Sequence, residues 1–342
     1  MTKPSTRLTQ LDGIRAVAIS SVFIHHAFNL PLLWMGVDIF FVLSGFLITG
    51  ILVDRKAQGK SYFSYFYARR ARRILPPYAL LLVFVSAVSG LAWISHWYWF
   101  LFLANVGAVL GQLGLSDELN PLWSLALEEQ FYLIWPVAVL LLSRRGLYRF
   151  SIGLLAVVPL LRFFAAPYMP SFFYIYFLLP FRMDLLAAGA LCALVWRDQR
   201  EWFAKWAPTV RWLPALSLAL LALLSRFPSF RTNKNTSIGS LFIYELTLLL
   251  SVSMLIWALG STGRFKHILD LPVMRTLGIL SYTFYLVHAT MLVLVQRWHL
   301  SLIPGALVAF TLSIAYALIS WYVMERRLIH GPRLPLFERE AA

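Results

Sequence analysis

The sequence predicts an all-α integral membrane protein with about ten transmembrane helices and cytoplasmic N- and C-termini. Of its 342 residues, 60% are hydrophobic and 13% are charged, a balance that leaves too little polar surface for a soluble domain. Apolar runs of roughly 20 residues recur along the chain, and Lys and Arg gather between them. The net charge of +15 therefore indicates membrane topology and not a nucleic-acid partner.

We place the predicted spans at residues 10–30, 35–53, 74–94, 121–142, 150–166, 175–196, 210–227, 239–260, 276–297 and 304–325. The aromatic-rich segment 97–111 is short, so we assign it to an additional interfacial or re-entrant helix. With this choice, 23 of the 30 Lys and Arg residues face the cytoplasm, as the positive-inside rule requires. We expect one membrane domain over 1–342, without an appended soluble domain. The single cysteine, Cys192, excludes an intrachain disulfide, and we expect no metal site.

Ionisable residues inside predicted spans are candidate functional groups, because each costs several kcal/mol to bury in hydrocarbon. In the first span, Arg15 and His26 lie eleven residues apart. They therefore share one helix face about 16 Å apart, with Arg15 near the inner side and His26 near the outer side. The alternative is that Arg15 reaches the inner headgroups and His26 the outer surface.

The second span carries Asp38, and a buried carboxylate needs a cationic partner such as Arg182 or a protonated His26. Ser44 and Gly45 in the same span permit the close approach of a ligand, or equally of another helix.

In the fourth span, Glu128 and Glu129 are adjacent and follow Trp123. Neighbouring helix positions diverge by about 100°, so the two carboxylates serve different partners. The alternative to a catalytic role is a structural ion pair with a buried arginine.

Later spans contribute Arg182, Asp184 and His288. Arg182 and Asp184 face apart at i and i+2, so each needs a partner on a neighbouring helix. His288, near the middle of its span, needs one too. Together the ionisable residues predict a polar interior cavity.

Before the third span, Arg69, Arg72 and Arg73 share one helical face at i, i+3 and i+4. Three guanidinium groups on one face can hold the phosphates of a nucleotide-bearing cofactor. The alternative is an anchor for anionic lipid.

These motifs resemble those of the acyltransferase-3 membrane proteins over nearly the whole chain. The resemblance rests on the segment Leu11–Arg15 with His26, on Gly36–Ile48, on the Arg69-x-x-Arg72 spacing, on Trp123–Tyr132, and on Ser281–His288. It implies a multi-pass protein of the bacterial inner membrane that transfers an acyl group, commonly acetyl, from cytoplasmic acyl-CoA to a glycan hydroxyl. It also implies essential roles for Arg15 and His26, and a role for Arg69 and Arg72.

The resulting hypothesis assigns cofactor binding to Arg69, Arg72, Arg73 and Arg15. It assigns catalysis to His26 as general base, or as nucleophile, with Glu129 or Glu128 orienting its imidazole and with Arg15 and Asp38 nearby. Arg182 or His288 would stabilise the oxyanion, and Arg182, Asp184, His288, Ser44 and Trp123 would line the substrate site.

Two other functions fit the same composition. One is acylation of a small secondary metabolite such as a macrolide. The other is a transporter or flippase with charges near the membrane midplane, although the sequence shows no repeat of one half in the other. Besides membrane lipid, we expect acyl-CoA and a glycan or other hydroxyl acceptor as partners.

Overall fold

The computed structural model describes residues 8–330 except 60, 112–116 and 232–233. Regular secondary structure in these ranges is helical throughout, which confirms the predicted all-α class. Both chain ends lie outside the described residues, and so do five basic residues that we assigned to the cytoplasmic side: Lys3, Arg7, Lys60, Arg333 and Arg339. The orientation of the termini therefore stays a prediction.

A helix corresponds to each predicted span. These helices are α1 (Thr9–Phe28), α2 (Gly36–Gln58), α3 (Tyr62–Ser89), α5 (Leu122–Leu141), α6 (Arg144–Ala165), α8 (Met183–Asp198), α10 (Leu213–Leu224), α11 (Ser237–Gly260), α13 (Pro272–Gln296) and α14 (Leu302–Ser320). The shorter helices are α4 (Ala104–Val109), α7 (Phe172–Phe177), α9 (Arg200–Val210), α12 (Arg264–Leu269) and α15 (Arg326–His330).

Seven helices among the described residues are long and apolar enough to cross a membrane, or eight if the bent pair α9–α10 forms one span. The chain is thus a multi-pass membrane protein, and the count of ten spans stays a prediction. The segment 97–111, predicted as an interfacial or re-entrant helix, contains a 3₁₀ turn at Trp97–Trp99, followed by the short helix α4. No long helix forms there.

Two of the differences from the predicted boundaries change where candidate residues lie. Helix α3 begins at Tyr62 instead of residue 74, so the arginine cluster is part of a long continuous helix. The span predicted at 175–196 is broken, because α7 ends at Phe177 and a 3₁₀ turn over Leu179–Phe181 precedes α8. Pro180 explains the break, since proline lacks a backbone donor and pushes the preceding residue out of helical geometry.

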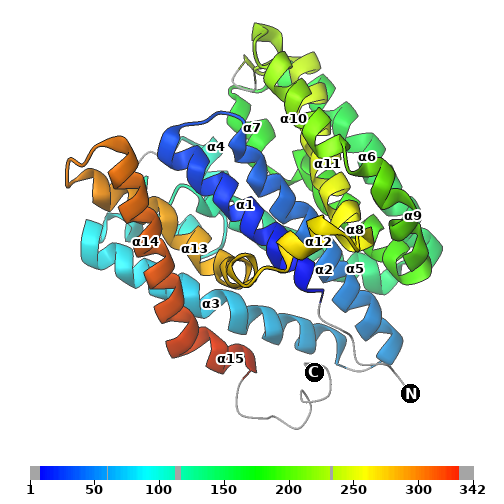
Figure 1. Cartoon of the computed structure of the whole chain (residues 1–342), viewed down its shortest axis with the longest axis horizontal. Helices are drawn as coiled ribbons and strands as arrows, with labels where there is room; N and C mark the ends of the chain where they lie inside the picture. Colours follow the sequence, from blue (N-terminus) through cyan, green and yellow to red (C-terminus); the bar gives the residue numbers. More distant parts are fainter. Residues whose placement is uncertain (1–7, 60, 112–116, 232–233, 331–342) are drawn as a thin grey trace.

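Helix α1 packs between α2 and α13 near the centre of the molecule (Figure 1). Helices α6, α8, α9, α10 and α11 gather on one side of this core, and α3 and α14 lie on the other. Glycines allow the closest contacts: a Cβ atom at Gly45 would lie 2.0 Å from the Leu186 carbonyl oxygen, and one at Gly278 would lie 1.9 Å from that of Asp12. The core helices α1, α2 and α13, together with α3 and α5, surround the candidate site.

Candidate active site

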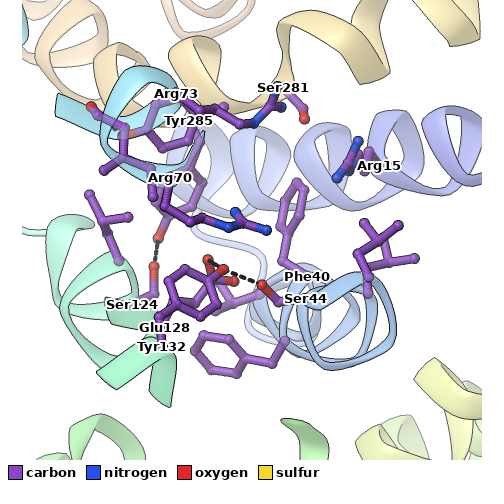
Figure 2. Close-up of a pocket in the computed structure, with 17 residues that line it drawn as sticks. Arg15, Phe40, Ser44, Arg70, Arg73, Ser124, Glu128, Tyr132, Ser281 and Tyr285 are labelled. Carbon is purple, nitrogen blue, oxygen red and sulfur yellow. Dashed lines mark hydrogen bonds between the residues drawn. The ribbon is translucent and has the colours of Figure 1, made fainter. Parts of the chain in front are cut away.

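One pocket, which we call the arginine pocket, is lined by residues of α1, α2, α3, α5 and α13. Its lining residues are Arg15, Val37, Phe40, Phe41, Leu43, Ser44, Leu47, Arg70, Arg73, Ile74, Ser124, Leu125, Glu128, Tyr132, Ser281, Tyr282 and Tyr285. The cavity volume is about 100 Å³, so it is a narrow slot. Figure 2 shows the Arg70 guanidinium reaching into the space beside Phe40 and Glu128. Three guanidinium groups against one carboxylate favour an anionic ligand.

Helix α3 presents Arg70 and Arg73 to this pocket, and not the pair Arg69 and Arg72 that we predicted. Arg69 and Arg72 are exposed, whereas Arg70 and Arg73 are partly buried. Arg69 instead donates a hydrogen bond to the hydroxyl of Tyr65 at 3.1 Å. Of the three arginines predicted on α3, Arg73 therefore lines the pocket, and Arg70 was missed.

A sequence signal for Arg70 was present. The buried residues of α3 include Phe66, Ile74 and Leu81, and Arg70 lies four residues from Phe66 and from Ile74. Since positions four apart share a helix face, the apolar stripe predicts that Arg70 points inward with it.

The two adjacent carboxylates have different surroundings, as their helical positions predicted. Glu128 lines the arginine pocket and accepts a hydrogen bond from the Tyr132 hydroxyl at 2.9 Å. That hydroxyl is also hydrogen-bonded to Ser44, so Ser44 belongs to the arginine pocket. Glu129 lies outside both pockets described here, with Arg70 as a charged neighbour.

A second pocket, the histidine pocket, lies beside the first and has a cavity volume of about 490 Å³. Its lining residues are Val22, His25, His26, Trp34, Val37, Ala108, Val109, Gly111, Asn120, Pro121, Trp123, Ser171, Phe173, Tyr176, Phe177 and Tyr285. Its described lining contains aromatic rings and small polar groups but no Asp, Glu, Lys or Arg. Arg15 and His26, predicted on one face of α1, thus line separate pockets.

The ring of His26 contacts His288 on α13, and neither glutamate contacts it. Nδ1 of His26 lies 2.9 Å from Nε2 of His288, and the two ring centroids are 5.0 Å apart. The predicted pairing of His26 with Glu128 or Glu129 is therefore wrong for this structure. The close packing of α1 against α13 places an imidazole where we expected a carboxylate.

Val37 and Tyr285 form the boundary between the pockets, since both residues line both cavities. The Tyr285 hydroxyl lies 2.5 Å from the hydroxyl of Ser124 and 2.8 Å from the carbonyl oxygen of Pro121. These contacts fix the tyrosine against the start of α5. Figure 2 shows the contact between Ser124 and Tyr285 at one edge of the arginine pocket.

Asp38, Arg182 and Asp184 line neither pocket and form buried ion pairs instead. Asp38 pairs with Arg182, one of the two partners that the sequence predicted, and not with His26. Asp184 pairs with Arg162 at 2.5 Å, and Arg162 also pairs with Glu245. These contacts join α2, α8, α6 and α11. The catalytic role predicted for Asp38 and the substrate-binding roles predicted for Arg182 and Asp184 stay predictions.

The remaining predicted site residues, Trp123 and His288, lie at or next to the histidine pocket. Trp123 lines the histidine pocket and stacks on Phe177 with ring centroids 4.5 Å apart. His288 is fully buried and reaches that pocket through His26. Among the described residues, no group of three or more His, Cys, Asp or Glu side chains could hold a metal ion. The arrangement suits an anionic ligand on one side of Val37 and Tyr285, and an uncharged ligand beside a histidine on the other.

Comparison with known proteins assigns the chain to a family. A family described as an acyltransferase domain matches residues 8–326. "Peptidoglycan O-acetyltransferase OatA" of Listeria monocytogenes is 39% identical over 153 residues, which cover 38% of this chain and 24% of the relative. "Putative peptidoglycan O-acetyltransferase YrhL" of Bacillus subtilis is 32% identical over 326 residues, covering 83% of this chain and 48% of the relative.

A "Putative O-acetyltransferase" of Staphylococcus aureus is 27% identical over 348 residues, covering 92% of this chain and 56% of the relative. The chain thus spans about half the length of these last two relatives, and its match to the Listeria protein covers less. No solved structure matches it.

Proposed function

Because the chain belongs to the acyltransferase-3 family, we propose that it is a membrane O-acetyltransferase that transfers an acetyl group from acetyl-CoA to a hydroxyl of a bacterial cell-wall glycan. One observation carries the proposal: an arginine-lined pocket and a histidine-lined pocket meet at Val37 and Tyr285. The names of the Listeria and Bacillus relatives support acetyl as the group and peptidoglycan as the acceptor class.

The donor is assigned to the arginine pocket. Arg15, Arg70 and Arg73 come from two helices and converge on one narrow cavity, where their guanidinium groups can bind phosphate oxygens bidentately. With the predicted orientation, this pocket faces the cytoplasm, where acetyl-CoA is available. The bacterial relatives support a location in the bacterial inner membrane. A cavity of about 100 Å³ that ends at Val37 and Tyr285 suits the slender pantetheine arm better than a sugar.

The acceptor is assigned to the histidine pocket. The aromatic rings of Trp34, Trp123 and Tyr176 line it together with the Asn120 amide. Flat aromatic faces pack against the apolar faces of sugar rings, while amide and hydroxyl groups bind sugar hydroxyls. The volume of about 490 Å³ is within the usual range for pockets that bind small ligands.

His26 acts as the general base in this proposal. It removes the proton from the acceptor hydroxyl, and the oxygen attacks the thioester carbonyl carbon. The carbon–sulfur bond then breaks, and the proton held by His26 passes to the departing thiolate. The products are the acetyl ester and free CoA, so atoms and charge balance without a metal or an oxidant.

Purified protein in lipid nanodiscs, incubated with radiolabelled acetyl-CoA and soluble peptidoglycan fragments, tests the proposal. We expect CoA release and labelled ester that both depend on the fragments. His26→Ala should abolish both, and His267→Ala on α12, outside both pockets, should not. Full activity of His26→Ala would overturn the mechanism. Uptake of a ligand into vesicles without CoA release would favour a transporter instead.

A further inference from the structure

His288 links His26 to the backbone of α13 through two hydrogen bonds in series. Nδ1 of His288 lies 2.6 Å from the carbonyl oxygen of Tyr285. Its other nitrogen, Nε2, lies 2.9 Å from Nδ1 of His26. His288 is fully buried, whereas His26 is exposed to the histidine pocket.

The chemistry of these partners fixes where the protons are. A carbonyl oxygen can only accept, so Nδ1 of His288 must carry its proton and donate to Tyr285. A neutral His288 then has an unprotonated Nε2, which can only accept. Nδ1 of His26 must therefore donate to it. Neutral His26 is left with a lone pair on Nε2, the nitrogen farthest from His288.

His25 takes no part in this chain. Its Nδ1 lies 2.6 Å from the carbonyl oxygen of Leu30, so it donates to a different segment of backbone. Among the described residues, the ionisable side chains that act electrostatically on His26 are His288 and His25, with no carboxylate among them, and the Val22 backbone is a further hydrogen-bond partner. The orienting group that a carboxylate supplies in other His-based acyl transfers is therefore an imidazole here.

We propose that His288 is the positioning residue for His26, holding it in the tautomer whose Nε2 lone pair faces the acceptor hydroxyl. The catalytic consequence of this inference rests on the proposed function. The assignment of the tautomer does not, because it follows from the hydrogen bonds alone. The carbonyl of Tyr285, the buried His288 and the exposed His26 form a hydrogen-bond chain of fixed direction. A backbone carbonyl on a long helix cannot rotate away, so the chain is anchored at one end.

The same chain also accommodates the charge that forms during the reaction. When Nε2 of His26 takes the hydroxyl proton, the proton on Nδ1 can shift to Nε2 of His288. The positive charge is then shared by two rings, and the Tyr285 carbonyl still accepts from Nδ1 of His288. When the thiolate leaves, the His26 Nε2 proton moves to it and the Nδ1 proton returns to His26, so both histidines end neutral.

A matched pair of substitutions separates positioning from packing. His288→Gln and His288→Met have side chains of similar length, but only glutamine offers an oxygen that can accept from Nδ1 of His26. We expect His288→Met to lower kcat by about 100-fold or more, with the KM for acetyl-CoA little changed because His288 is outside the arginine pocket. His288→Gln should recover at least a tenth of the wild-type kcat, again as an order of magnitude.

Thr290→Ala provides the control for changing the interior of α13. Thr290 is buried two residues after His288 and donates to the carbonyl oxygen of Glu118, away from both pockets. It should retain kcat. Equal activities of His288→Gln and His288→Met would overturn the positioning role.

The tautomer can be measured directly by NMR on protein with ¹⁵N-labelled histidine, with the His26 signals assigned from His26→Ala. We expect a protonated Nδ1 and an unprotonated Nε2 in the wild type, and loss of this preference in His288→Met. A wild-type His26 protonated on Nε2 would overturn the inference whatever the activity. An inactive wild type with the expected tautomer would instead count against the proposed function alone.

Discussion

The Arg182 guanidinium donates a hydrogen bond to the Asp38 carboxylate between α8 and α2, and both side chains are completely buried. Thr247 on α11 donates to the second carboxylate oxygen at 2.6 Å. The ring centroid of Tyr244 lies 4.7 Å from the Arg182 guanidinium carbon, close enough for a cation–π contact. This cluster ties three helices together, and the Arg182 guanidinium lies behind two rings of the histidine pocket, with its carbon 5.9 Å from the Trp34 centroid and 5.2 Å from the Tyr176 centroid.

Replacing one member of this ion pair should destabilise the protein more than replacing both. Asp38→Leu or Arg182→Met alone leaves one buried charge without its partner, which costs about 3–5 kcal/mol. The double variant removes both charges and should recover much of that loss. Denaturant unfolding in detergent measures the effect. A double variant less stable than either single variant would show that the pair contributes net stability of its own.

The arginines of α3 provide a second prediction. Arg70→Ala should raise the KM for acetyl-CoA by about tenfold or more, since a charge-assisted hydrogen bond contributes roughly 1.5–3 kcal/mol. Arg69→Ala is the matched control, because Arg69 is the neighbouring residue but is exposed and bonded to Tyr65. Steady-state kinetics with varied donor would distinguish them. A larger effect at Arg69 would place the phosphates on the other face of α3.

The fold was largely predictable because membrane spans follow from local composition. Runs of about 20 apolar residues and the distribution of Lys and Arg are readable without knowing any long-range contact. The interruption before α8 was missed, although Pro180 signalled it. Apart from Arg182 and Asp184 that segment is apolar, and hydropathy alone cannot distinguish a straight helix from a broken one.

The sequence identified many of the ionisable residues near the site, but it could not show which of them contact one another. A buried Asp38 must have a cation, so Arg182 could be named as its partner. Many groups could form a hydrogen bond with His26. Its contact with His288 depends on how α1 and α13 are aligned along each other, and the spacing of residues in the sequence does not give that alignment. Arg70 was missed for a simpler reason. We chose the inward face of α3 from the spacing of its arginines, and not from the positions of its apolar residues.

The contact between α2 and α8 provides a third prediction. A Cβ atom at Gly45 or Gly189 would lie 2.0 Å from a carbonyl oxygen of the opposite helix, so Gly45→Ala must push the helices apart. We expect a loss of about 1–3 kcal/mol in unfolding free energy. Gly153→Ala in α6 is the control, because its Cβ would meet nothing within 4 Å and alanine favours a helix. If both substitutions changed the unfolding free energy equally, the close contact between α2 and α8 at Gly45 would be contradicted.

The final prediction concerns the length of the acyl chain. In the proposed reaction the thioester carbonyl must lie where the two pockets meet, which is beside Val37 and Tyr285. Tyr285 is fixed by Ser124 and Pro121, so the buried Val37 side chain limits the space for the acyl group. A propionyl group needs room for one more methylene than acetyl.

Val37→Ala should therefore raise the ratio of kcat/KM for propionyl-CoA to that for acetyl-CoA by about tenfold, the lower end of what one methylene in a tight pocket contributes. Val37→Phe should lower transfer of both acyl groups while CoA binding at the arginines persists. Val158→Ala is the control, since Val158 is buried in α6 but lines neither pocket. Competition between the two donors measures the ratio directly. If Val37→Ala and Val158→Ala leave it equally unchanged, the acyl group lies elsewhere and the junction of the pockets is not the site of transfer.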